Sequence, residues 1–241
     1  MPKLSRGEIE IHYEVHGTGH PVLLLAPGGM RSSIEFWQKS PYDPIRELAG
    51  KFRVIAMDQR NAGASRAPVS GSDGWHSYAA DQLALLDELG IERAHVLGGC
   101  IGGAFALKLC AIAPTRISAA VLQQPIGFSG TNRELFFTMF DGWAQDLKKA
   151  GRDFAETELD AFKQRMYAGD FTFSATREDA ARCSVPLLVL RGDDQYHPAP
   201  ISEEIARIAP RAALVEKWKT GDDVSHAVSR VIAFLTENTP S

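Results

Sequence analysis

Cys100 is the side chain whose type and surroundings most clearly allow chemistry, because it lies within the run GGCIGG at 98–103. The apolar residues 94–97 before this run predict a buried strand, and the apolar residues 104–113 after it predict a helix. A small-x-nucleophile-x-Gly turn between a strand and a helix is a nucleophile elbow, which exposes its central side chain over a helix N-terminus. A thiol in that place ionises more readily than a free thiol. The pattern therefore predicts that Cys100 is a nucleophile that attacks an acyl carbon.

Two backbone N–H groups are candidates for stabilising the oxyanion that such an attack would form. The first belongs to Ile101, directly after the nucleophile. The second belongs to Gly29, which follows Pro27 and Gly28 at the end of an apolar run. The alternative for Cys100 is a small buried hydrophobe that fills the turn. The alternative for the two glycines is a tight strand exit.

The size and composition of the chain are those of one large α/β domain with a modest insertion. The chain has 241 residues, of which 44% are hydrophobic and 23% are charged, which is enough for a sizeable core. The net charge of −4 gives no reason to expect nucleic acid or an anionic membrane surface as a partner. The longest apolar stretch, 94–113, is not expected to cross a membrane, because glycines and Lys108 interrupt it.

The three cysteines, Cys100, Cys110 and Cys183, have the spacing of neither a disulfide framework nor a metal site. A reducing cytosol is the simplest setting for them, and the first seven residues lack the apolar core of a signal peptide. We therefore expect a cytoplasmic protein without a bound metal. The chain also lacks the Gly-x-Gly-x-x-Gly pattern of dinucleotide binding and the Gly-Lys-Ser/Thr of a P-loop, so no cofactor is expected.

Short apolar strands alternate along the chain with amphipathic helices, which predicts a mainly parallel sheet with helices on both faces. A half-exposed strand is expected where polar and apolar residues alternate over 8–15. Buried strands are expected at 21–26, 52–57, 94–97, 119–122 and 185–190, and a last strand at 212–215. Helices are expected at 33–49, interrupted by two prolines, and at 78–89, 104–113, 200–209 and 224–235.

The stretch 126–183 differs from the rest, because it reads as helical and holds eight of the twelve phenylalanines. It divides the chain into the first part of a core domain over 1–125, a helical cap over 126–183 and the second part of the core domain over 184–241. The cap follows the end of a strand, which is where ligands bind in parallel sheets. We therefore expect the cap to cover the functional site.

Apolar side chains close to the elbow are expected to form the wall of a pocket for a small molecule with an apolar part. Phe136 and Phe140 fall on one face of a cap helix, and Met30 and Trp37 lie near the turn that contains Gly29. The alternative is that these side chains only pack the cap onto the core. Exposed aromatic residues of the cap would mark either a substrate entrance or the interface of a homodimer.

Five motifs, in order along the chain, resemble those of the α/β-hydrolase superfamily. The resemblance covers nearly the whole chain and implies an α/β fold with a mostly parallel central sheet, helices on both faces and a helical cap insertion. The motif at 58–65 resembles the family's Asp-Gln-Arg-Gly-x-Gly-x-Ser loop, with Asn61 in place of the first glycine. The others are the oxyanion loop at 27–29, the helix before the elbow at 78–91, the elbow itself, and the loop of the catalytic acid at 192–198.

The resemblance also implies a catalytic triad. Asp194 has the family's spacing after the penultimate strand, so it would orient a histidine and stabilise its imidazolium, with Asp193 as the alternative. The family places that histidine after the last strand, where His226 is available but lies close to the last helix. The alternative for His226 is a surface histidine near a helix N-terminus. His197 does not match the family's base and is expected to line the pocket.

The function that follows from the resemblance is hydrolysis of an ester, thioester or lactone with an apolar moiety through Cys100. His226 would deprotonate Cys100 and later activate water, while Asp194 would orient His226. A Cys-His-Asp set on this fold resembles the dienelactone hydrolases. The alternative is a degenerate member of the superfamily, either a non-hydrolytic lyase or cyclase or a small-molecule-binding protein. The unusual position of His226 motivates this alternative.

Overall fold

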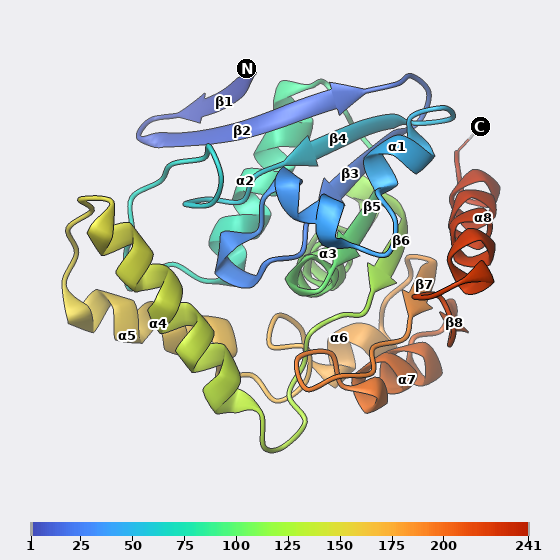
Figure 1. Ribbon diagram of the computed structural model, residues 1–241. Coiled ribbons are helices and arrows are strands. Elements are labelled where there is room, and N and C mark those ends of the chain that lie inside the picture. The colour runs from blue at the N-terminus through green and yellow to red at the C-terminus, as the bar shows by residue number, and fades with distance from the viewer. Residues whose placement is uncertain (1, 241) are drawn as a thin grey trace.

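The computed structural model describes residues 2–240 and is built around one eight-stranded sheet (Figure 1). The strand order is β1-β2-β4-β3-β5-β6-β7-β8. β2 runs antiparallel to both of its neighbours, and every other neighbouring pair is parallel. The predicted α/β class with a mostly parallel sheet and helices on both faces is therefore confirmed.

The elements have the following bounds. The strands are β1 (Lys3–Arg6), β2 (Ile9–His16), β3 (Pro21–Leu25), β4 (Arg53–Met57), β5 (Ala94–Gly99), β6 (Ile117–Gln123), β7 (Leu187–Leu190) and β8 (Ala212–Val215). The α-helices are α1 (Pro44–Leu48), α2 (Trp75–Glu88), α3 (Ile101–Ile112), α4 (Arg133–Lys149), α5 (Glu156–Tyr167), α6 (Arg177–Ala181), α7 (Ala199–Ile208) and α8 (Asp222–Glu237). Short 3-10 helices are η1 (Gly29–Arg31), η2 (Ile34–Lys39) and η3 (Pro114–Arg116).

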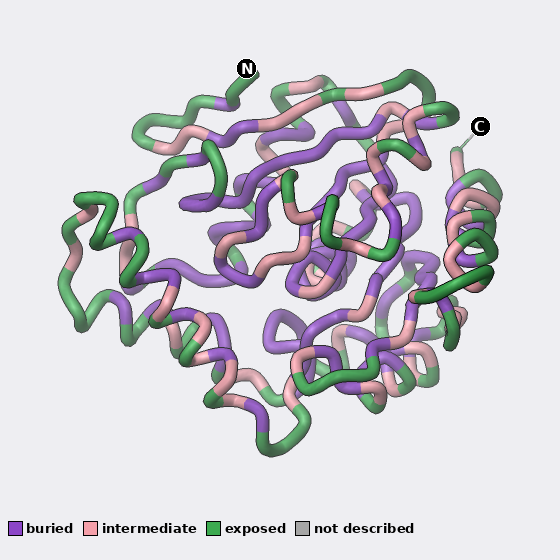
Figure 2. The backbone as a smooth tube through the Cα atoms, viewed as in Figure 1, coloured by how far each residue is buried: buried purple, intermediate pink, exposed green. Residues whose placement is uncertain are grey.

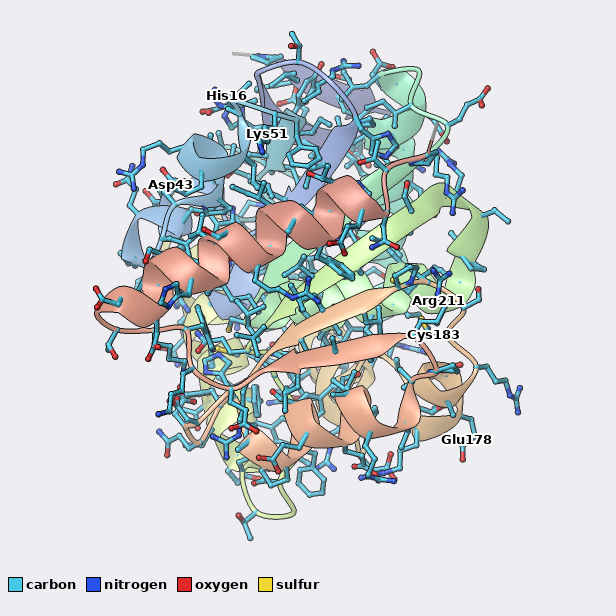
Figure 3. All side chains as sticks on the ribbon, turned by 90° about the vertical axis from the view of Figure 1, so that its right-hand side faces the viewer. His16, Asp43, Lys51, Glu178, Cys183 and Arg211 are labelled. Atoms are coloured by element: carbon cyan, nitrogen blue, oxygen red, sulfur yellow. The ribbon has the colours of Figure 1, made fainter. Side chains whose placement is uncertain are left out.

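The strands separate two hydrophobic clusters, because successive side chains of a strand point to opposite faces of the sheet. In β3, Leu23 and Leu25 belong to the larger cluster, with residues of α2, α3 and α7, while Val22 and Leu24 belong to the smaller cluster, with residues of α1 and α8. Figure 2 shows the resulting buried centre, and Figure 3 shows α8 lying across its face of the sheet. Burial on both faces explains why the central strands are continuous apolar runs.

Two predicted elements differ from the structure at the N-terminal side. The helix expected over 33–49 is two shorter pieces, η2 and α1, with the residues around Pro41 between them. Pro44 begins α1, where its missing N–H costs no hydrogen bond, and Asp43 caps that helix by accepting from the N–H of Ile45. The edge strand β1 was not predicted, because only Leu4 of its four residues is buried and one apolar residue gives no alternating pattern.

The segment 126–183 carries α4, α5 and α6, and α4 and α5 project beside the loops that follow β3 and β4 (Figure 1). Side chains of this segment bond to those loops. Trp143 Nε1 donates to the carbonyl oxygen of Asn61 at 3.1 Å, and Arg31 pairs with Asp146 at 2.5 Å. Met139 of α4 lies where a Cβ on Gly29 would be, so α4 packs directly on that turn. Among the helices of residues 2–240, no apolar helix is long enough to cross a membrane.

Candidate active site

The turn at Cys100 has the geometry of a nucleophile elbow. Cys100 is the N-cap of α3, and its backbone has φ 58° and ψ −119°, a left-handed φ that L-residues rarely adopt. A Cβ on Gly98 would overlap the backbone of Gly102, and a Cβ on Gly102 would overlap the carbonyl oxygen of Leu25 in β3. The small residues therefore let α3 start directly against the sheet. The half-buried Cys100 side chain stands at the carboxyl ends of the parallel strands.

The loop after β7 brings an acid and a histidine together. Both carboxylate oxygens of Asp194 lie 2.8 Å from Nδ1 of His197. Asp194 Oδ1 also accepts from the backbone N–H groups of Tyr196 at 2.8 Å and His197 at 2.9 Å. A Cβ on Gly192 would overlap the carbonyl oxygen of His197, so glycine is required for this tight loop. The loop thus fixes Asp194 with its own backbone and fixes His197 with Asp194.

The hydrogen bonds of His197 define which of its nitrogens is available. An ionised carboxylate only accepts hydrogen bonds, so Nδ1 of His197 carries a proton and donates a hydrogen bond to Asp194. Nε2 is buried and has no hydrogen-bond partner within residues 2–240. Asp194, by contrast, is largely exposed, with 45% of its side chain accessible against 11% for His197. Nε2 is therefore the nitrogen that can exchange a proton in the site.

His197 and Cys100 influence each other's protonation. Burial alone would raise the pKa of the Cys100 thiol, but the positive charge of His197 and the backbone N–H groups near the thiol outweigh it, and the pKa is lowered. Burial alone would lower the pKa of His197, but the thiolate of Cys100 and the carboxylate of Asp194 raise it to about 9. Both shifts favour a thiolate beside an imidazolium. The pair therefore has the electrostatics of an activated cysteine nucleophile.

The backbone N–H groups of Ile101 and Gly28 approach the thiol, and both contribute to lowering the pKa of Cys100. Ile101 is one of the two donors expected from the sequence. Gly28 precedes the other, Gly29, which has φ 60° and begins η1 under Met139. Sequence reasoning missed Gly28, because adjacent glycines in a tight turn give no pattern that separates their N–H directions. Gly29 as an oxyanion donor stays a prediction.

The expected pairing of Asp194 with His226 is wrong in this structure. His226 is exposed in the second turn of α8, and Asp194 bonds His197 instead. The physical reason is the short connection from β8 to α8, which puts position 226 inside a helix on one face of the sheet. The spacing Asp-x-x-His could have revealed the pair, since three residues of a tight loop bring two side chains together.

The four other predicted pocket residues separate into two groups. Met30, Phe136 and Phe140 are buried in the larger hydrophobic cluster, against which Cys100 packs. Phe140 lies inside the helical segment, with its ring 5.2 Å from both Trp143 and Phe162. Trp37 belongs to the smaller cluster across the sheet, and its place in the wall of a pocket stays a prediction. A Cβ on Gly99 would lie 3.1 Å from the Trp37 ring, which accounts for its packing there.

The loop at 58–65 is held in place by hydrogen bonds and a buried ion pair. Asn61 has φ 57°, a conformation that Asn tolerates better than most residues, which explains how it replaces a glycine. The Asp58 carboxylate accepts from the backbone N–H groups of Ile34 and Ala64, each at 2.8 Å. Buried Arg60 pairs with Asp81 of α2 at 2.8 Å. Across residues 2–240, no group of three or more His, Cys, Asp or Glu side chains could hold a metal ion.

Comparison of the chain with known protein families agrees with the fold and with the elbow at Cys100. The α/β hydrolase fold family matches residues 21–177, more than half of the chain, and the chain belongs to that family. Solved structures show the same fold over nearly the full length. A meta-cleavage product hydrolase (CumD) of Pseudomonas fluorescens IP01 aligns with a TM-score of 0.70, 21% identity and 96% of each chain covered. The enol-lactonase of Burkholderia xenovorans LB400 aligns with a TM-score of 0.69 and 22% identity over 98% of this chain and 100% of its own.

Parts of the chain are also similar to curated proteins. A stretch of 122 residues is 34% identical to the proposed carbamate hydrolase RutD of Azorhizobium caulinodans, over 51% of this chain and 43% of RutD. A stretch of 130 residues is 32% identical to the proposed non-heme bromoperoxidase BpoC of Mycobacterium tuberculosis, over 53% of this chain and 47% of BpoC. The matched stretches therefore span less than half of the length of either relative.

Proposed function

We propose that this chain is an acyl hydrolase that uses Cys100 as a covalent nucleophile, His197 as its acid and base, and Asp194 as the residue that orients His197. The observation that carries the proposal is the Asp194–His197 hydrogen bond, which leaves Nε2 of His197 buried and unpartnered. The mutual pKa shifts of Cys100 and His197 support it, since they favour the thiolate that attack requires.

In the acylation half of the reaction, the Cys100 thiolate attacks the carbonyl carbon of the substrate. A carbon–sulfur bond forms, and the carbonyl electron pair moves onto oxygen. The N–H of Ile101, with that of Gly28 or Gly29, stabilises this oxyanion. As the carbonyl re-forms, the bond to the leaving oxygen or sulfur breaks, and the imidazolium of His197 protonates the leaving group.

In the deacylation half, neutral His197 takes a proton from water through Nε2. The resulting hydroxide attacks the acyl-thioester on Cys100, the same N–H groups stabilise the second oxyanion, and the thiolate departs. The imidazolium of His197 is restored beside the thiolate, so the enzyme returns to its starting state. Asp194 stabilises the imidazolium in both halves and keeps Nε2 directed at the site.

The proposed substrate is an ester, thioester or lactone with an apolar moiety. Met30, Phe136 and Met139 supply apolar surface near the elbow, and α4 and α5 would act as the cap that excludes water. RutD and the enol-lactonase are named for carbamate and enol-lactone chemistry, and both kinds of substrate have a carbonyl carbon open to attack. The unusual position of His226 motivated the non-hydrolytic alternative, and the contact between Asp194 and His197 favours the hydrolase over it.

Turnover of aryl esters and acyl thioesters by wild type and Cys100→Ala tests the proposal, with intact mass measured in parallel. We expect wild-type turnover and an acyl adduct, and loss of both in Cys100→Ala to the level of the uncatalysed reaction. A Cys100→Ala variant that retains wild-type turnover would contradict the covalent mechanism. Absence of turnover and adduct across the whole panel would favour a binding protein or a lyase instead.

A further inference from the structure

The hydroxyl group of Tyr167, at the end of α5, is a buried polar group without a structural role. Its side chain is fully buried, and its oxygen has no hydrogen-bond partner in the part of the chain that the structure describes. A buried phenol normally finds a partner, because removing it from water without one costs free energy. An orphaned hydroxyl in this position therefore needs an explanation.

The surroundings of Tyr167 hold its ring in one place. The ring stacks on Phe136 at 5.3 Å and meets Phe173 edge-on at 5.5 Å. Arg133 donates to the carbonyl oxygen of Tyr167, and Trp75 Nε1 donates to the carbonyl oxygen of Met166 at 2.7 Å. The backbone and ring are thus fixed by contacts that leave the hydroxyl unused.

Packing connects this hydroxyl to the proposed catalytic residues. Phe136 stacks on Tyr167 and also meets Tyr196, the neighbour of His197, edge-on at 5.8 Å. Cys100 packs against the same hydrophobic cluster that contains Tyr167 and Phe136. Burial raises the pKa of Tyr167, and its interactions with Tyr78 and Cys100 add to that shift, so the phenol stays protonated. Tyr167 therefore places an unused hydroxyl donor within the hydrophobic cluster against which Cys100 packs.

We propose that the Tyr167 hydroxyl is a specificity-determining group that donates a hydrogen bond to a neutral oxygen on the acyl part of the substrate, next to the reacting carbonyl. The inference rests on the proposed function for the identity of the reacting carbonyl. It narrows the substrate class to acyl groups that carry an ether, keto or hydroxyl oxygen at that position.

The surroundings of Tyr167 suit a neutral oxygen of a substrate better than a substrate carboxylate. The rings around Tyr167 are apolar, and the guanidinium of Arg133 lies over Phe128 at 4.1 Å with its N–H groups on backbone carbonyls. The imidazolium of His197 is already neutralised by Asp194 and the thiolate. A buried carboxylate would lack a cation of its own, whereas one donor satisfies an ether or keto oxygen.

The test compares para-nitrophenyl methoxyacetate with para-nitrophenyl butyrate, which have similar acyl shapes but differ by one oxygen in place of a methylene. The ratio of kcat/KM for the two esters is measured in wild type, Tyr167→Phe and Tyr42→Phe. Tyr42 is the matched control, because its hydroxyl is also buried and unpartnered but lies in the smaller cluster with α1 and α8. Comparing ratios removes the difference in intrinsic reactivity of the esters.

We expect Tyr167→Phe to lower the preference for the methoxyacetyl ester by about tenfold, the effect of one lost hydrogen bond to a buried acceptor. In Tyr167→Phe the loss is expected chiefly in KM for the methoxyacetyl ester, with the butyryl ester unaffected. In Tyr42→Phe the ratio is expected to equal that of wild type. An equal effect of Tyr167→Phe on both esters would overturn the proposal, since a purely structural role would not distinguish them.

Binding separates this inference from the proposed hydrolysis. Calorimetry with ethyl methoxyacetate and ethyl butyrate uses Cys100→Ala with and without Tyr167→Phe, so it needs no turnover. We expect Cys100→Ala to bind the methoxyacetate more tightly and the added Tyr167→Phe to remove that preference. If wild type turns over no ester but Cys100→Ala still binds the methoxyacetate more tightly than the butyrate, only the proposed hydrolysis is refuted. Equal binding of both esters by Cys100→Ala would refute the role of Tyr167.

Discussion

The pairing of Asp194 with His197 concentrates two functional side chains in one loop. Because Asp194 Oδ1 also accepts two backbone N–H groups of that loop, the carboxylate keeps its direction even though the side chain is largely exposed. These hydrogen bonds, together with His197, lower the pKa of Asp194 against the opposing effect of burial, so it remains ionised. A single short loop therefore does the work that requires two loops when the acid and base follow different strands.

The pH dependence of Cys100 alkylation tests this arrangement. With iodoacetamide, the inactivation rate of wild type is expected to rise to its plateau below the ordinary thiol pKa of about 8.5, since the imidazolium of His197 stabilises the thiolate. In His197→Gln that charge is absent, burial then favours the neutral thiol, and the apparent pKa is expected to rise above the ordinary value. Mass mapping assigns the adduct to Cys100.

His226→Gln is the control for that measurement. His226 is exposed on α8, so its removal is expected to leave the alkylation profile and the turnover unchanged. Identical profiles in wild type and His197→Gln would remove His197 from the site. A profile shifted in His226→Gln alone would return the role to the histidine first expected from the sequence.

At the scale of elements, the start of α3 depends on its close approach to β3. Gly102 lies in the first turn of α3, and the carbonyl oxygen of Leu25 occupies the place where its Cβ would be. Alanine would favour the helix by about 1 kcal/mol, but a backbone carbonyl in the middle of a sheet cannot move aside as a flexible side chain can. The clash should therefore exceed the gain in helix propensity.

Gly102→Ala is accordingly expected to lower the free energy of unfolding by about 2 kcal/mol. It should also lower kcat, because a shifted α3 displaces the N–H of Ile101 from the oxyanion. Urea denaturation and ester turnover measure the two effects. Gly50→Ala is the control, since a Cβ there meets no atom within 4 Å, and its stability should change by less than about 1 kcal/mol. A Gly102→Ala variant as stable as wild type would contradict the close approach.

At the scale of the whole molecule, one sheet serves two hydrophobic clusters, and the segment 126–183 is fastened to the loops at the carboxyl ends of its strands. Trp143 bonds to Asn61 after β4, and Met166 at the end of α5 accepts from Trp75 of α2. The larger cluster contains side chains from the segment and from the sheet together. The segment and the core therefore have no separate interiors.

Such shared packing predicts a single cooperative unfolding transition. Urea titrations followed by tryptophan fluorescence and by far-ultraviolet circular dichroism are expected to have the same midpoint. Trp75 and Trp143 report on the junction with the segment, while Trp37 and Trp218 report on the smaller cluster. A fluorescence transition that precedes the loss of secondary structure would mean that the segment detaches before the core unfolds.

Hydrophobic pattern and turn chemistry made most of the fold predictable from the sequence. The periods of apolar residues identified the central strands and the long core helices, and the elbow glycines located Cys100 at a strand end. The pattern did not predict every element end, as in the region 33–49, where a five-residue α1 and the 3-10 helix η2 replace one helix. The side of the sheet on which Trp37 packs was not predictable, because periodicity does not fix the direction of a side chain in a connecting segment.

The sequence by itself determined the fold class, the elbow and the position of Asp194, since these depend on local spacing and on the period of buried residues. Only the tertiary structure decided which histidine joins Asp194, which tyrosine hydroxyls are left without a partner, and which turn packs under α4. Each of these depends on where side chains from separate elements meet. That outcome is governed by the packing of the whole chain, which no local pattern in the sequence records.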